Sequence, residues 1–235
     1  MLSIIFPIRD EEKNLQNIIE IFQQNKFDFN FEIIFVNDFS KDKSFEIIKK
    51  LEENNSNIIS LDNKNKGIGG AINLAINHAK GNYCCIMMAD LSDSLQDLKK
   101  YYEIISNKRI DAVFGSRFIR GSKCTDYPLK KLILNRIFNI FVKIIYFNKY
   151  NDYTNAFKIY KKESLKSTLP LVSESFNIFL EIPLKIIGRK LKYEIVPISW
   201  QNRKSGQTKF KIDELKSKYL FTLIYCLIEK VLLKK

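Results

Sequence analysis

Short apolar runs alternate with amphipathic segments over the first half of the chain. The first amphipathic segment is typical, because Leu15, Ile18, Ile19 and Phe22 recur at the spacing of one helix face. The apolar runs predict strands at 2–6, 31–36, 57–61, 83–88 and 111–114. The amphipathic segments predict helices at 14–24, 43–51, 71–80 and 95–105. Strands that alternate with helices through short connections predict an α/β fold with a mostly parallel central sheet and helices on both faces.

Polar residues follow three of the predicted strands. Pro7 ends the first strand and precedes the charged residues 9–12, residues 37–38 (Asn-Asp) follow the second, and Asp90 and Asp93 follow the fourth. Ligands of such sheets bind beyond the carboxyl ends of the strands. A bound cation, or the base and ribose of a nucleotide, would explain acidic side chains there. The alternative is helix capping, which can coexist with binding and for which the candidates are Ser40, Ser92 and Asp93.

The formal charge of +13 is unevenly distributed. Residues 1–115 hold 14 Lys/Arg against 17 Asp/Glu, whereas residues 116–235 hold 25 against 9. This asymmetry indicates either a Lys-rich solvated face or a polyanionic partner, which could be nucleic acid, a phosphorylated ligand or an anionic membrane. The basic residues form no recognisable nucleic-acid-reading motif, and the acidic strand ends oppose a polyanion, so the sequence argues against nucleic acid.

Two long segments of the second half are apolar, aromatic and basic. They cover residues 129–150 and 211–235, and both have apolar residues at helical spacing. They are either core helices with basic edges or helices that lie in a membrane interface with their lysines near the headgroups. We expect a domain at 1–210, divided into halves at 1–115 and 116–210, followed by a C-terminal amphipathic helical segment through which an oligomer could form.

The remaining features indicate a cytoplasmic protein, with the inner face of the membrane as a site of peripheral contact. The chain shows no secretory signal, and the longest apolar stretch, 219–228, is about half the roughly 20 residues that span a bilayer. The four cysteines have no zinc or redox spacing, which favours reduced thiols.

Several motifs together resemble those of one enzyme family. The chain contains Pro-Ile-Arg-Asp-Glu at 7–11, Val-Asn-Asp-Phe-Ser at 36–40, Gly-Ile-Gly-Gly-Ala at 67–71, Met-Ala-Asp-Leu-Ser at 88–92, Gly-Ser-Arg-Phe at 115–118, Asp-Tyr-Thr-Asn-Ala-Phe-Lys at 152–158 and Arg-Lys-Ser-Gly-Gln-Thr-Lys at 203–209. From residue 4 to about 210 the chain is similar to the family-2 glycosyltransferases of the GT-A fold, and specifically to polyprenyl-phosphate (dolichyl-phosphate) mannose and glucose synthases.

The resemblance implies roles for individual residues. The nucleotide would be bound by Pro7, Arg9, Glu11, Val36, Asp38, Gly67, Ala89 and Asp90. A divalent cation, Mg²⁺ or Mn²⁺, would bind Asp90, with Asp93 replacing the aspartate that the family carries where this chain has Met88, since a thioether is a poor ligand for a hard cation. The phosphates and the acceptor would be bound by Lys131, Arg136, Arg203 and Lys209. The catalytic group would be Asp90, Arg117, Asp152 and Glu181.

The implied activity is inverting, metal-assisted transfer of a sugar from a UDP- or GDP-linked donor to an acceptor, expected to be a lipid phosphate. A phosphate acceptor is already an anion and needs no base, whereas a saccharide hydroxyl would need Asp152 or Glu181 as its general base. A sugar-nucleotide nucleotidyltransferase would share the sheet, but residues 7–11 lack the glycine-rich loop expected after its first strand.

Overall fold

The computed structural model describes residues 1–65, 67–202 and 212–233. The strands are β1 (Leu2–Ile8), β2 (Phe31–Asn37), β3 (Ile58–Asp62), β4 (Tyr83–Ile86), β5 (Ala112–Ser116), β6 (Lys123–Thr125), β7 (Lys158–Lys161), β8 (Tyr193–Pro197) and β9 (Ser199–Gln201). The helices are α1 (Glu12–Gln24), α2 (Ser44–Asn54), α3 (Ile68–His78), α4 (Leu95–Asn107), α5 (Leu129–Tyr146), α6 (Lys162–Lys166), α7 (Ile178–Gly188) and α8 (Ile212–Leu232). Each helix and strand predicted in the first half is present.

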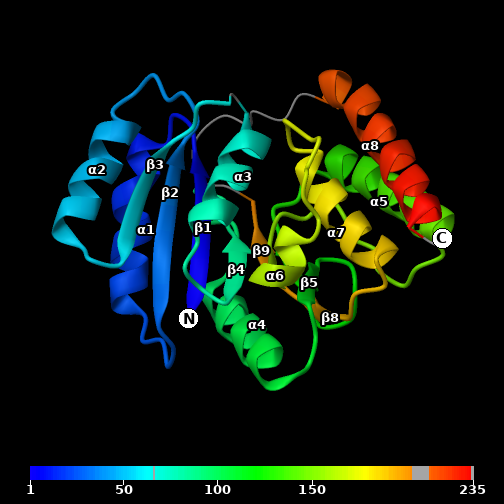
Figure 1. The fold of residues 1–235 in the computed structure, drawn as a ribbon, viewed down its shortest axis with the longest axis horizontal. Helices are drawn as coiled ribbons and strands as arrows, with labels where there is room; N and C mark the ends of the chain where they lie inside the picture. Colours follow the sequence, from blue (N-terminus) through cyan, green and yellow to red (C-terminus); the bar gives the residue numbers. More distant parts are fainter. Residues whose placement is uncertain (66, 203–211, 234–235) are drawn as a thin grey trace.

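The central sheet has seven strands in the order β3-β2-β1-β4-β7-β5-β8. Every neighbouring pair is parallel except the two that β7 makes, because β7 runs antiparallel to both β4 and β5. The predicted mostly parallel sheet is therefore confirmed. A separate two-stranded sheet pairs β6 with β9. In Figure 1, α1 and α2 lie at one end of the molecule, and α5, α7 and α8 lie at the other.

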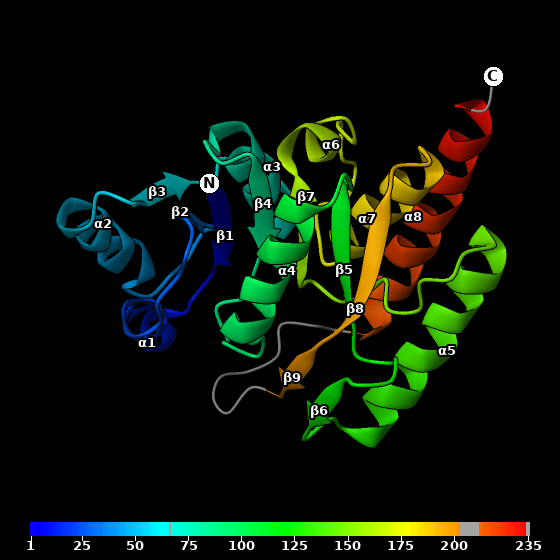
Figure 2. The same cartoon turned by 90° about the horizontal axis from the view of Figure 1, so that it is seen from below.

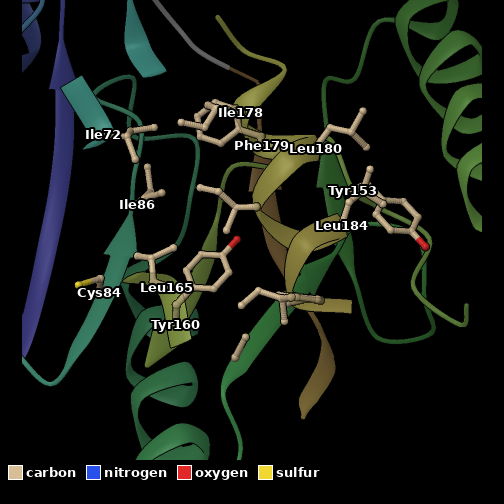
Figure 3. Close-up of a cluster of buried hydrophobic side chains, with 14 of the residues drawn as sticks. Ile72, Cys84, Ile86, Tyr153, Tyr160, Leu165, Ile178, Phe179, Leu180 and Leu184 are labelled. Carbon is tan, nitrogen blue, oxygen red and sulfur yellow. The ribbon is translucent and has the colours of Figure 1, made fainter. Parts of the chain in front are cut away.

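Two apolar clusters, one on each face of the sheet, form the core. Alternate residues of a strand point to opposite faces, so Ile4 belongs to one cluster and Ile5 to the other. Helices α1, α2 and α4 cover the Ile4 face, and α3, α5, α6, α7 and α8 contribute to the Ile5 face. Figure 3 shows part of this second cluster, in which Leu165 of α6 lies near Tyr160 of β7 and Leu184 of α7 lies near Tyr153.

Two boundaries differ from the sequence-based prediction. Pro7 does not end β1, because the strand continues to Ile8 with Pro7 opposite Val36 of β2. The helix predicted at 129–150 ends at Tyr146, where Phe147 takes a left-handed conformation with φ of 48°. This backbone conformation cannot continue a right-handed helix.

Helix α8 is part of the core as well as a surface helix. Tyr219, Leu223 and Cys226 are each at most 6% exposed and belong to the cluster on the Ile5 face. The helix also carries a row of exposed apolar side chains on its other side. Within the described ranges, no helix combines the length and the apolar character needed to cross a membrane.

Candidate active site

The carboxyl ends of β1 and β2 bring the first two polar segments together. Ile8 pairs with Asn37, and the Asp38 N–H donates to the Ile8 carbonyl at 2.7 Å. The side chains that follow are neighbours, since Arg9 Nη1 lies 4.0 Å from Asp38 Oδ2. The parallel register therefore places these two predicted nucleotide-binding residues side by side.

Asp38 fixes the turn that precedes α3. Its side chain is nearly buried, and Oδ1 accepts hydrogen bonds from the Gly67 N–H at 2.7 Å and from Asn63 Nδ2 at 3.0 Å. Gly67 has φ of +111°, and a Cβ there would collide with the Glu174 carbonyl oxygen. The glycine is needed for both its backbone conformation and its close packing. Asp38 and Gly67, both predicted from sequence, thus belong to one hydrogen-bonded unit.

Hydrogen bonds join the loop after β1 to the loop before α2. The N–H groups of Asp10 and Glu11 donate to Ser40 Oγ and Ser44 Oγ, and the Glu11 carboxylate accepts from Asn14 Nδ2 at 2.7 Å. Helix α2 begins without a side-chain cap, so the suggestion that Ser40 caps it is wrong. Ser40 instead stabilises the approach of the two loops.

Asp90 and Asp93 lie in the turn between β4 and α4. Asp90 Oδ1 accepts hydrogen bonds from the Ser92 N–H at 3.2 Å and from Ser92 Oγ at 2.7 Å. Burial and the nearby Asp90 carboxylate raise the pKa of Asp93 to about 7. The N-cap of α4 is Ser94, whose Oγ accepts from the Gln96 N–H, so neither Ser92 nor Asp93 caps this helix. Capping therefore does not explain the two carboxylates.

The pair offers two hard oxygen ligands for a cation. No group of three His, Cys, Asp or Glu side chains suited to a metal occurs in the part of the chain that the structure describes. The repulsion between Asp90 and Asp93 is the kind that a divalent cation relieves, and carboxylate oxygens suit Mg²⁺ or Mn²⁺. Met88 packs against the apolar cluster on the Ile5 face, and Ala89 is buried. The two aspartates therefore fit a cation, although they do not complete its coordination.

Arg117 and Asp152 form a buried ion pair beside this turn. The guanidinium contacts the carboxylate at two points, Nη2–Oδ1 at 2.6 Å and Nε–Oδ2 at 2.8 Å. Burial opposes the charge on Arg117, but the adjacent Asp152 carboxylate outweighs it and raises the pKa of the arginine. Two predicted catalytic residues are thus in direct contact, and both oxygens of the Asp152 carboxylate are bound by Arg117.

Three aromatic rings surround the Arg117 guanidinium. The centroids of Phe118, Tyr127 and Trp200 lie 5.3, 5.5 and 5.7 Å from its central carbon. Sequence reasoning missed Tyr127 and Trp200. The available signal was weak: Trp200 is the single tryptophan of the chain and stands just before the basic motif at 203–209.

A second guanidinium shares the Phe118 ring. Arg136 of α5 lies over that ring at 4.6 Å, and its buried Nη1 atom has no hydrogen-bond partner among the residues that the structure describes. Lys131 lies five residues earlier on the same helix and is partly buried. Arg203 and Lys209, the other two predicted phosphate-binding residues, lie outside the described residues. The arginines at 117 and 136 therefore form a cationic site around Phe118.

Glu181 contacts a different set of residues from those described above. Its carboxylate is fully buried on α7, accepts from the N–H groups of Val172 and Ser173 at 2.9 and 2.8 Å, and pairs with Lys185 at 2.9 Å. These contacts satisfy the carboxylate and tie α7 to the preceding segment. They describe a structural role, and they do not favour the catalytic one suggested from sequence.

The sheet order and the carboxylate turn after β4 define the class of protein. This is the GT-A fold of nucleotide-diphospho-sugar transferases, and solved structures share it. Glucosyl-3-phosphoglycerate synthase from Mycobacterium tuberculosis, in complex with UDP, aligns with a TM-score of 0.71 at 12% identity over 96% of this chain and 79% of that chain. S. aureus TarS, in complex with UDP-GlcNAc, aligns with a TM-score of 0.66 at 17% identity over 97% of this chain and 66% of that one.

The sequence comparison then gives the family. The chain belongs to glycosyl transferase family 2, whose profile matches residues 3–169. It is 27% identical to a protein of Pyrococcus furiosus named dolichol-phosphate mannosyltransferase, over 89% of this chain and 59% of that protein. It is 26% identical to dolichyl-phosphate beta-glucosyltransferase ALG5D of Trichomonas vaginalis, over 94% of this chain and 74% of that protein. Glycosyltransferase AglD of Haloferax volcanii is 22% identical, and this chain spans only 34% of its length.

Proposed function

We propose that this protein transfers a sugar from a UDP- or GDP-linked donor to a polyprenyl phosphate, with inversion at the anomeric carbon. Family membership supports sugar transfer, and the names of two relatives include dolichol or dolichyl phosphate. The loops after β1 and β2 would hold the nucleotide, with Arg9 and Asp38 at its ribose and base. Pro7, Glu11, Val36, Gly67 and Ala89 would shape this part of the site.

The observation that carries the choice of acceptor is the cationic site around Phe118. Arg117 and Arg136 lie on the same ring, and within the described ranges the buried Nη1 of Arg136 has no hydrogen-bond partner. A buried, unpaired donor on a charged group is costly, so such an atom indicates a missing acceptor atom. A phosphate oxygen would satisfy it and would balance the charge of Arg136, since the charge of Arg117 is already paired with Asp152.

The two carboxylates proposed as general bases support the same choice. Asp152 is bound by Arg117, and Glu181 is bound by Lys185 and two backbone N–H groups. The oxygens of both carboxylates are therefore already engaged by partners within the protein, which leaves them poorly placed to contact an acceptor hydroxyl. A phosphate acceptor attacks as an anion and does not require either group.

The leaving nucleoside diphosphate needs positive charge. Asp90 and Asp93 would hold Mg²⁺ or Mn²⁺, which neutralises developing negative charge on the diphosphate when bound. Arg117 lies beside this turn and supplies a fixed positive charge from the protein itself. Arg203 and Lys209 remain proposed contributors from the segment after β9, and Lys131 from α5.

We also propose peripheral contact with the inner face of the membrane. Helices α5 and α8 lie side by side, since the Phe138 and Tyr219 rings are 5.5 Å apart and Lys230 Nζ donates to the Tyr146 carbonyl (Figure 2). Both helices expose large apolar side chains. They are Leu129, Ile133, Leu134, Ile137, Ile140, Phe141 and Ile144 on α5 and Leu220, Phe221, Ile224, Ile228, Val231 and Leu232 on α8. Such an area requires a cover of lipid or of another chain, and a lipid-linked acceptor favours lipid.

A transfer assay tests the proposed activity. Labelled UDP- and GDP-sugars with Mn²⁺ are offered to farnesyl phosphate, to farnesol and to a panel of saccharides. We expect label to enter farnesyl phosphate and not farnesol, and Arg136→Gln to reduce the rate at least about tenfold if a charge-assisted hydrogen bond is lost. Arg109→Gln is the matched control, because Arg109 is exposed on the surface after α4. Label transferred to saccharide hydroxyls alone would refute the phosphate acceptor.

A further inference from the structure

The hydroxyl of Tyr127 lies between the site and helix α5. It accepts one hydrogen bond from Arg117 Nη1 at 3.3 Å and another from Asn135 Nδ2 at 2.9 Å. Arg117 stands at the end of β5, whereas Asn135 is on α5. One hydroxyl group therefore connects the buried arginine to the helix whose outer side is apolar and exposed.

The aromatic ring of Tyr127 makes a third connection. It packs against the Trp200 ring with centroids 4.8 Å apart, and both rings flank the Arg117 guanidinium. Trp200 is on β9, and its backbone forms an isolated antiparallel bridge with Asp93. Tyr127 thus contacts the arginine, α5 and the strand next to the carboxylate turn.

These hydrogen bonds form a closed circuit that is completed by the backbone between Asp152 and Thr154. Asn135 Oδ1 accepts from Thr154 Oγ1 at 2.9 Å, and Thr154 is two residues after Asp152, which binds Arg117. Each member is therefore held from both sides. Asp152 binds two nitrogens of the guanidinium, and within the described part of the chain Tyr127 is the partner of the third, Nη1. Because the guanidinium is planar, the two Asp152 contacts set its plane, and the Tyr127 contact at Nη1 adds a third point that keeps this plane from tilting.

We propose that Tyr127 is a positioning residue that, together with Asn135, orients Arg117 toward a phosphate group of the substrates. The inference rests on the proposed function, and the phosphate belongs either to the nucleotide donor or to the polyprenyl phosphate. Tyr127 does not need to touch either one. Its role is to hold the guanidinium plane, because hydrogen bonds from arginine to phosphate depend strongly on the orientation of that plane.

The test is a double-mutant cycle on ligand affinity. Tyr127→Phe removes only the hydroxyl and keeps the ring between Arg117 and Trp200, and Asn135→Ala removes the other end of the bond. Calorimetry measures the affinity of each variant for UDP with Mn²⁺ and, separately, for farnesyl phosphate. We expect each single variant to weaken one of the two ligands by about 5- to 10-fold, the effect of one hydrogen bond. The double variant should be no weaker than the singles, because they break the same circuit.

The two arms and the control give distinct outcomes. The ligand whose affinity falls identifies the phosphate that Arg117 contacts. Tyr102→Phe is the matched control, because Tyr102 is on α4, packed against Phe29, and should bind both ligands as the wild type does. A Tyr127→Phe variant with a lower melting temperature but wild-type affinity for both ligands would overturn the inference and leave the proposed function intact. A wild-type protein that binds neither ligand would instead overturn the proposed function, and the inference with it.

Discussion

Arg117 and Asp152 hold each other in a two-point ion pair in the protein interior. The arginine side chain is 7% exposed and the aspartate is fully buried, and the Arg117 N–H adds a third bond to Oδ2 at 2.9 Å. The partners are 35 residues apart in sequence. The pair therefore joins the end of β5 to the segment before β7, and it orients the Arg117 guanidinium at the site.

Replacing Asp152 with asparagine should strongly destabilise the protein. The change leaves the Arg117 charge buried without its partner, and breaking a buried pair in this way costs about 3–5 kcal/mol. Urea unfolding measures the loss. The exposed pair between Lys161 and Glu163 supplies the control, because Glu163→Gln should change the free energy of unfolding by less than about 1 kcal/mol. Equal losses in both variants would contradict the account.

Asp93→Asn should weaken the binding of Mn²⁺. Asparagine lacks the negative charge with which Asp93, together with Asp90, would bind the cation. We therefore expect the apparent dissociation constant for Mn²⁺ to rise by about tenfold or more. Isothermal titration in the presence of UDP measures it. Ser94→Ala removes the N-cap of α4 and should cost about 1 kcal/mol of stability without changing metal affinity. An Asp93→Asn variant with unchanged affinity for Mn²⁺ would show that Asp93 is not a ligand.

Lys158 should make stability depend on pH above neutrality. Its buried Nζ donates to the Tyr153 and Asn155 carbonyls, and burial lowers its pKa from 10.5 to about 7. Between these values the unfolded chain binds the proton and the folded protein does not, so stability increases with pH from about 7 upward. Below pH 7 Lys158 is protonated in the folded protein, so burial of its charge lowers the free energy of unfolding by its full amount.

The variant Lys158→Met tests this dependence. The free energy of unfolding of the wild type, relative to that of the variant, should rise between pH 7 and 9.5 by up to about 1.4 kcal/mol per pH unit. Urea titrations at each pH give the difference. Lys50→Met, at an exposed position on α2, should show no such trend. A pH-independent difference for Lys158→Met would mean that the lysine keeps an ordinary pKa in the folded protein.

Membrane contact should depend on the exposed apolar residues of α5. Ile137 and Ile144 are 61% and 64% exposed, so Ile137→Gln with Ile144→Gln should preserve the fold and reduce binding to anionic vesicles severalfold. Flotation at low salt measures binding, and high salt should weaken it. Phe39→Gln is the control, because Phe39 is exposed on the loop before α2, away from both α5 and α8. Deleting α8 would be a poor test, because its buried side completes the core. Wild-type protein that remains soluble at low salt but forms a dimer lost in the double variant would assign the face to a second copy.

Local pattern was sufficient to predict the first half of the fold. The spacing of apolar residues depends only on neighbours in the chain, and it gave β1 to β5 and α1 to α4 within a few residues. The polar segments after β1, β2 and β4 also followed from sequence, because parallel strands must end at one edge. Residues such as Asp38 and Asp90 could be selected on that ground alone.

The second half was harder to predict because its strands are short and its helices are apolar on several sides. Strand β7 has four residues and enters the sheet antiparallel between β4 and β5, which no local pattern indicates. Sequence alone could not distinguish Glu181 as a base from Glu181 as a buried partner of Lys185. It likewise could not show that α8 has a buried side formed by Tyr219, Leu223 and Cys226.

The sequence by itself determined the class of fold, the family and the loops that carry the site, because these depend on local periodicity and on short motifs. Tertiary structure alone decided which of the candidate side chains meet. Asp152 became a partner of Arg117 rather than an available base, and Tyr127 came to connect α5 with the site. These relationships join residues that are distant in sequence, and their geometry is set by packing across the sheet, which no linear pattern encodes.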